Sequence, residues 1–178
     1  MDLNLPSPRT ANLLGALALG LADEIRTASE CKANEGGPAP AAVTLIGHVP
    51  DLSINQLRRA LGLSHSGAVR LVDRLASDGL VQRLPSPHDG RLVALHLTAD
   101  GERQRNAILS ERHARLLTAL GRLSPHEQSD LDRSLAKLLA AYVRDEGHAY
   151  QVCRLCDERT CINCPVENAL ECSHSAED

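Results

Sequence analysis

Residues 51–84, DLSINQLRRALGLSHSGAVRLVDRLASDGLVQRL, constrain the fold more than any other part of the sequence. Ser53 followed three residues later by Gln56 forms a capping-box pattern that predicts the start of a helix, and Gly62 predicts its end. Ser64 predicts the N-cap of a second helix. Two helices joined by a turn of three or four residues are typical of a helix-turn-helix, and also of a plain α-α hairpin. These residues alone leave both structures open.

The second helix has two faces of different character. Its apolar face carries Ala68, Leu71, Val72 and Leu75, and its outer face carries Ser66, Arg70, Asp73, Arg74 and Ser77. Residues 53–98 hold six arginines and three aspartates, a net charge of +3, whereas residues 145–178 hold two arginines and eight acids, a net charge of −6. Because arginine suits contacts with phosphate and guanine, the middle of the chain, and not its tail, is expected to face nucleic acid.

The residues after the second helix predict a β-hairpin. Two strand-like runs, LVQRL and RLVALHL, are joined by the turn-rich PSPHDG, and the second run places Val93, Leu95 and Leu97 on one face. A helix pair followed by a hairpin is a winged helix-turn-helix. In that arrangement the second helix enters the major groove, and the hairpin tip, here with His88, Asp89 and Arg91, reaches toward the DNA backbone or the minor groove.

Further helices flank this region. A stripe of Leu14, Leu17, Leu21 and Ile25 predicts a helix over about 10–30, and a short helix is expected over about 40–48. Two long helices follow, over about 99–121 and from Ser124 onward, the second with the apolar stripe Leu131, Leu135, Leu138 and Tyr142. Helices of roughly 30 Å, at 1.5 Å per residue, are too long for one small core to cover. Together with the first helix they predict a dimerisation layer.

Three stretches carry a family resemblance: VRLVDRLASDGLVQR at 69–83, DGR at 89–91 and LTADG at 97–101. Over about residues 10–145 the chain resembles the multiple-antibiotic-resistance regulator (MarR) family of dimeric winged-helix transcription factors. The resemblance implies a mainly α fold with a small β-wing, built from six helices and a two-stranded hairpin. It also implies a homodimer that binds a pseudo-palindromic operator in double-stranded DNA.

The same resemblance assigns the DNA contacts. In the recognition helix and at its start they are Ser64, His65, Ser66, Arg70 and Arg74, and in the wing they are Asp89 and Arg91. The family commonly has Asp-Arg-Arg at the wing tip, whereas Gly90 holds the middle position here. The expected organisation is a dimerisation helix in 1–36, the winged helix-turn-helix in 37–98, dimerisation helices in 99–147 and a cysteine-rich metal-binding tail in 148–178.

Other classes of protein are not indicated. The sequence contains no G-x-S-x-G turn, Walker loop or H-E-x-x-H motif, so the chain is not expected to be an enzyme. It also lacks a secretory signal pattern and any run of the roughly 20 apolar residues that a membrane helix needs. We therefore expect a cytoplasmic protein with no membrane partner.

The tail contains a cysteine cluster, Cys153, Cys156, Cys161 and Cys164, with the spacing C-x2-C-x4-C-x2-C. In a reducing compartment such thiols are expected to be metal ligands or redox groups, and four thiolates suit either an iron–sulfur cluster or a zinc site with four cysteine ligands. The four-residue gap is shorter than the hairpin of a zinc ribbon and resembles ferredoxin spacing, which favours an iron–sulfur cluster. A metal-free thiol switch remains open, and Cys172 is an alternative to Cys153 as the fourth ligand.

The sequence therefore predicts a transcriptional regulator, expected to be a repressor, whose cysteine cluster senses redox state or iron. One alternative is the same regulator with a structural zinc site that only pins the acidic tail to the last helix. Another is a metal-clipped adaptor in which the helix pair binds protein. A steep dependence of binding on salt would distinguish a DNA-binding chain from an adaptor.

Overall fold

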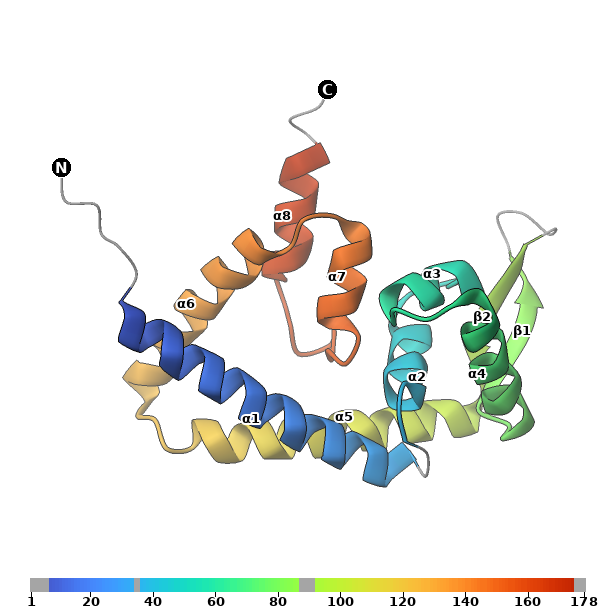
Figure 1. The fold of residues 1–178 in the computed structure, drawn as a ribbon, viewed down its shortest axis with the longest axis horizontal. Coiled ribbons are helices and arrows are strands. Elements are labelled where there is room, and N and C mark those ends of the chain that lie inside the picture. Colours follow the sequence, from blue (N-terminus) through green and yellow to red (C-terminus); the bar gives the residue numbers. More distant parts are fainter. Residues whose placement is uncertain (1–6, 34–35, 87–91, 175–178) are drawn as a thin grey trace.

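A computed structural model describes residues 7–33, 36–86 and 92–174, and in these ranges it contains eight helices and a two-stranded antiparallel sheet (Figure 1). The elements are α1 (Pro8–Ala33), α2 (Ala39–His48), α3 (Ile54–Ala60), α4 (His65–Ser77), β1 (Val81–Pro85), β2 (Val93–Leu97), α5 (Ala99–Leu120), α6 (Pro125–Tyr142), α7 (Glu146–Cys153) and α8 (Pro165–His174). The mainly α fold with a β-wing is confirmed. Six helices were expected, and the additional two, α7 and α8, lie in the cysteine tail.

The helices form three groups. Helices α1 and α5 pack along each other as one long layer (Figure 1). At one end of α5, helices α2, α3 and α4 and the hairpin form the winged helix, and α6, α7 and α8 lie over the other part of the layer. Helix α7 contacts α3, which brings the tail against the winged helix. Within the described ranges, no helix combines the length and the apolar character needed to cross a bilayer.

Local capping accounts for where the helices begin. The Ser53 hydroxyl accepts a hydrogen bond from the Gln56 backbone N–H at 3.2 Å, and the Gln56 side chain accepts one from the Ser53 N–H at 3.0 Å. Ser124 and Glu127 form the same reciprocal pair at the start of α6. These bonds satisfy N–H groups that the first turn of a helix leaves without partners. Gly62, with φ +64°, follows α3 in the left-handed region that favours glycine.

The core lies inside the winged helix and extends onto α5. The predicted apolar face of α4, formed by Ala68, Leu71, Val72 and Leu75, is buried. The largest fully buried apolar side chains are Leu45, Leu52, Leu57, Leu75, Leu95 and Ile108. Because the sequence has no Phe or Trp, this core is aliphatic, as composition predicted.

The hairpin corrects one prediction about the strands. Val93 was expected to share one face with Leu95 and Leu97, but burial differs along this face, because the Val93 side chain is 46% exposed and Leu97 is half-buried. Val93 pairs with Pro85 at the end of the hairpin, beyond the reach of the core. Ala94, which alternation placed outside, is buried because its strand pairs there with Ser53 through an isolated antiparallel bridge. Leu95 is buried as predicted.

The predicted stripes of α1 and α6 are present but only partly covered in a single chain: Leu21, Ile25 and Leu131 are half-buried. On α1, Leu14 and Leu17 are 49% and 56% exposed, and on α6, Leu138 and Tyr142 are 53% and 64% exposed. Soluble proteins place such apolar rows against another surface, because large exposed apolar patches mark interaction sites.

The start of α5 fits closely beneath the turn between α4 and β1. The Thr98 hydroxyl donates to the Gly79 carbonyl at 2.5 Å and accepts from the Gly101 N–H at 3.1 Å, while the Thr98 N–H donates to the Leu80 carbonyl at 3.0 Å. A Cβ on Gly101 would overlap the Leu80 carbonyl oxygen. The glycine of the LTADG stretch therefore permits the backbone of α5 to touch this turn.

Gly101→Ala is expected to lower the free energy of unfolding by about 1–3 kcal/mol, because the added methyl group meets backbone that cannot move aside without shifting β1. Urea unfolding followed by circular dichroism measures this change. Gly36→Ala is the matched control, since a Cβ there meets only the Glu30 side chain at 4.0 Å. Equal stability of the two variants would show that the contact with Leu80 imposes no constraint.

Candidate DNA-binding surface and cysteine site

The outer face of α4 is the candidate DNA-binding surface. The N-cap Ser64 accepts a hydrogen bond from the Gly67 N–H at 3.1 Å, which fixes where the helix begins. All five residues predicted here, Ser64, His65, Ser66, Arg70 and Arg74, are exposed. Because helical residues four apart share a face, Ser66, Arg70 and Arg74 form one row. The structure therefore brings the helix part of the predicted site together.

A neighbouring ion pair ties this face to the wing. Arg83 on β1 contacts Asp73 on α4, with an N–O distance of 2.6 Å. Both side chains are partly exposed, so the pair adds little to stability. It does hold β1 against the recognition helix and neutralises Arg83. Sequence reasoning counted Arg83 with the positive charges and missed this pairing.

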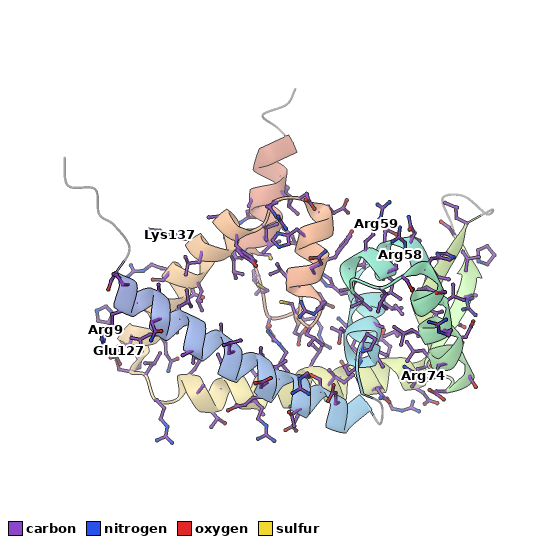
Figure 2. The ribbon with its side chains drawn as sticks, in the orientation of Figure 1. Arg9, Arg58, Arg59, Arg74, Glu127 and Lys137 are labelled. Carbon is purple, nitrogen blue, oxygen red and sulfur yellow. The ribbon has the colours of Figure 1, made fainter. Side chains whose placement is uncertain are left out.

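The arginines of the winged helix do not form one patch. Figure 2 shows Arg58 and Arg59 on the side of α3 nearest α7, and Arg74 at the side nearest α5. Arg58 donates from Nε to the Asn55 side chain at 2.7 Å. The Arg59 carbonyl accepts from the Gln151 side chain of α7 at 3.4 Å. Within the described part of the winged helix, these three arginines therefore lie on two sides.

The wing part of the predicted site, Asp89 and Arg91, lies outside the described residues, and so does His88. Their DNA contacts stay a prediction.

The second candidate site is the cysteine segment. Helix α7 ends at Cys153, and α8 begins directly after Cys164, whose carbonyl accepts the Asn168 N–H at 3.0 Å. The four thiols of Cys153, Cys156, Cys161 and Cys164 line one cavity of about 300 Å³. Its wall also includes His48 from α2 and Glu158 from the loop between the thiols, two residues that cysteine spacing gave no reason to select.

The thiols interact as two pairs, Cys153 with Cys156 and Cys161 with Cys164. The hydrogen bond from Cys153, aided by the charge of Arg112, lowers the pKa of Cys156 to about 6. The same hydrogen bond and burial raise the pKa of Cys153 far above that of an ordinary thiol. Burial and the nearby Cys164 raise the pKa of Cys161 to about 11. Cys156 is therefore the most acidic of these three thiols.

A metal site also requires several donor side chains grouped around one point. In the part of the chain that the structure describes, no three His, Cys, Asp or Glu side chains are grouped so that they could hold an ion. The four thiols have the donor chemistry of a zinc or iron–sulfur site, and all four line the same cavity.

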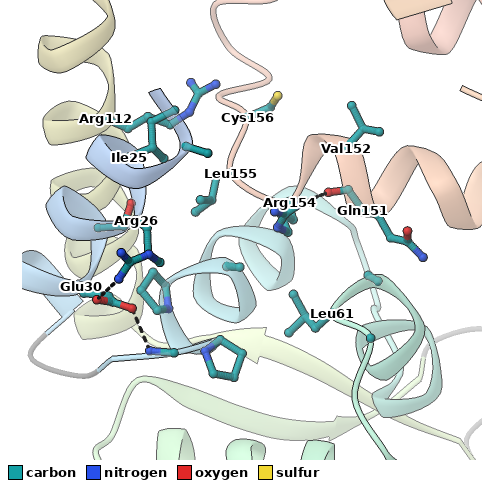
Figure 3. Close-up of a pocket in the computed structure, with 18 of the residues that line it drawn as sticks. Ile25, Arg26, Glu30, Leu61, Arg112, Gln151, Val152, Arg154, Leu155 and Cys156 are labelled. Carbon is teal, nitrogen blue, oxygen red and sulfur yellow. Dashed lines mark hydrogen bonds and ion pairs between the residues drawn. The ribbon is translucent and has the colours of Figure 1, made fainter. Parts of the chain in front are cut away.

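A larger cavity, of about 750 Å³, lies between α1, α3, α5 and α7 (Figure 3). Arg26 contacts Glu30 at 3.5 Å on one wall, and Glu30 accepts from the Gly37 N–H at 3.2 Å. Arg112 and Cys156 lie on other parts of the wall. Because Cys156 lines both this cavity and the smaller one, its thiol lies between them.

Comparison with known proteins agrees with the architecture of the winged helix. Residues 38–92 match the sequence pattern of the MarR family. This region is therefore similar to the winged helix of the MarR family. The cysteine tail lies outside the matched residues. A solved structure of a MarR family protein from Bacillus stearothermophilus is similar with a TM-score of 0.65 and 26% identity, covering 79% of this chain and 100% of that one.

The chain is also similar to two curated proteins. It is 31% identical over 88 residues to the uncharacterized HTH-type transcriptional regulator YsmB of Bacillus subtilis, covering 49% of this chain and 60% of YsmB. It is 33% identical over 86 residues to the transcriptional repressor MprA of Escherichia coli K12, covering 48% of this chain and 49% of MprA. The chain thus spans between half and three fifths of the length of these relatives.

In the metal-free, reduced chain, Cys156 is expected to react with iodoacetamide faster than Cys161 at about pH 7, because only the thiolate is nucleophilic. The rate at Cys156 should rise as pH passes about 6 and then level off, since its pKa is lowered to about 6. Short alkylation pulses followed by peptide mass spectrometry give both rates.

Cys153→Ala is the control for the hydrogen bond. It removes the donor that stabilises the Cys156 thiolate, so the pH at which Cys156 becomes reactive should move upward. A faster reaction at Cys161 than at Cys156 in the parent chain would contradict the pairing described above.

Proposed function

We propose that this chain is a homodimeric, DNA-binding transcriptional regulator, and specifically a repressor. The observation that carries the proposal is the exposed row of Ser66, Arg70 and Arg74 on the second helix of a winged helix-turn-helix. Such a helix reads base edges in the major groove, where arginine pairs with guanine through two hydrogen bonds. The names of the relatives, an HTH-type transcriptional regulator and a transcriptional repressor, support the same function.

The partly covered leucine rows support the homodimer. The exposed side chains of α1 and α6 include Leu17 and Leu138. Helix α6 and the N-terminal part of α1 lie on the side of the molecule away from the hairpin (Figure 1). A second copy packed there buries both rows and presents two copies of α4. Two such helices fit a pseudo-palindromic operator in double-stranded DNA when they are spaced by about 34 Å, one turn of the double helix.

For the tail we propose an iron–sulfur cluster held by Cys153, Cys156, Cys161 and Cys164, which makes the regulator a sensor of redox state or iron. The shared cavity and the C-x2-C-x4-C-x2-C spacing support this proposal, because both place four potential sulfur ligands in one short part of the fold. When bound, the cluster supplies one-electron redox chemistry, which zinc does not have. The alternative is a structural zinc site with the same four cysteine ligands.

Arg70→Ala is expected to weaken binding to the preferred operator by about 1–3 kcal/mol, because a base-reading arginine is lost while the buried face of α4 is unchanged. The operator is first selected from random duplexes by repeated binding, and affinity is then measured by fluorescence anisotropy at fixed salt. Arg133→Ala, an exposed arginine of α6, is the control and should leave affinity unchanged. An unaltered affinity in folded Arg70→Ala would refute the role of this face.

Protein purified without oxygen is expected to be brown and to contain iron and sulfide, and Cys161→Ser should lose most of both, because it removes one of four ligands. Elemental analysis and visible absorption check this result. Colourless protein containing zinc would favour the structural alternative. Comparing Cys153→Ser with Cys172→Ser shows which of the two residues is the fourth ligand.

A further inference from the structure

The loop between the two cysteine pairs is attached to the winged helix of its own chain. Glu158, in this loop, forms an ion pair between its Oε1 and Arg105 Nη2 of α5. Its other oxygen, Oε2, lies 3.3 Å from Nδ1 of His48, the last residue of α2. One carboxylate of the cysteine segment thus contacts two helices of the DNA-binding half.

Arg105, the ion-pair partner of Glu158, is unusual because its side chain is only 5% exposed. It passes close to α2 at Gly47, where a Cβ would come within 2.5 Å of Arg105 Cδ. Its other carboxylate neighbour, Glu102, is at 3.7 Å and is itself about half exposed. A buried guanidinium needs a close counter-charge. Glu158 is the closer of these two carboxylates, so the loop supplies the main counter-charge of buried Arg105.

Two hydrogen bonds and one apolar contact also attach the cysteine segment to the rest of the chain. Arg159 donates to the Asn106 side chain on α5 at 3.1 Å, and Gln151 donates to the Arg59 carbonyl at the end of α3 at 3.4 Å. Leu155 packs against the hydrophobic core of the winged helix. The cysteine segment therefore contacts α2, α3 and α5, and α2 and α3 lead directly into the recognition helix.

The position of Glu158 ties this attachment to the thiols. It follows Cys156 by two residues and precedes Cys161 by three. The loop is short and folded by turns: the Thr160 N–H donates to the Asp157 carbonyl at 3.2 Å, and the Cys161 N–H to the Glu158 carbonyl at 3.3 Å. When Cys156 and Cys161 are drawn onto one ion or cluster, a loop of four residues cannot absorb the movement without moving Glu158.

We propose that Glu158 is the coupling residue of this regulator: through its contacts with Arg105 and His48, the metal state of the four cysteines changes the placement of α2 and α5, and with it the affinity of α4 for DNA. This inference rests on the function proposed above. Coupling between two binding sites is reciprocal, so DNA must change metal affinity by the same factor as metal changes DNA affinity.

The test uses Co²⁺ as the probe, because its thiolate complexes absorb visible light and can be titrated directly. The apparent Co²⁺ affinity of the reduced full chain is measured with and without the selected operator duplex. In the parent chain the duplex should change this affinity by at least about fivefold, and in Glu158→Gln by less than about twofold. Operator affinity with and without Co²⁺ should give the same two factors.

Glu167→Gln is the matched control. It removes the same charge from the wall of the same cavity, but it lies on α8 and not in the loop between the cysteine pairs. The control should keep the coupling of the parent chain. A merely structural role of Glu158 would lower stability or both affinities while leaving the ratio of affinities unchanged, so the ratio is the decisive readout.

The outcomes separate this inference from the proposed function. A parent chain that fails to bind Co²⁺, or fails to bind any duplex, overturns the proposed function and this inference with it. Binding of both with no coupling overturns the inference and leaves DNA binding in place. Coupling that survives in Glu158→Gln, or that is lost equally in Glu167→Gln, shows that Glu158 is not the link.

Discussion

The close contact between Gly101 and the Leu80 carbonyl fixes the position of the winged helix relative to α5. It joins the start of the 22-residue α5 to the turn that ends the recognition helix, and Thr98 adds hydrogen bonds to both sides of that turn. A long helix rotates as a unit, so any movement of α5 relative to its neighbours is passed to α4 and the hairpin. The orientation of the recognition helix therefore depends on the layer formed by α1 and α5.

The arginines have different environments, which composition alone does not distinguish. Arg70 is left exposed on α4, Arg83 is paired with Asp73, and Arg105 is buried against Glu158. The acidic tail, which sequence reasoning excluded from DNA contact, thus has one carboxylate inside the winged helix. The tail as a whole is repelled by phosphate, yet its loop is attached to the winged helix and α5 by the ion pair of Glu158 with Arg105 and by contacts of Arg159, Gln151 and Leu155.

Much of the fold follows from local sequence signals. Ser53, Ser64 and Ser124 cap helices where predicted, and the buried face of α4 follows from its spacing, because capping and periodicity depend on residues a few positions apart. The exposure of Val93 and the ion pair between Asp73 and Arg83 were not predicted from the sequence, because both depend on how strand and helix pack together. The contact of Glu158 with Arg105 joins residues 53 positions apart, so no local sequence pattern predicts it.

The leucine rows of α1 and α6 have a consequence for how the chain exists in the cell. Side chains such as Leu14, Leu17 and Leu138 offer apolar area to water in an isolated chain, and burying it in a symmetric pair stabilises both copies. In the homodimer proposed above, folding and pairing form one equilibrium whose position depends on concentration. Under that proposal a chain at low concentration is the least protected against proteolysis, so the amount of protein affects its own lifetime.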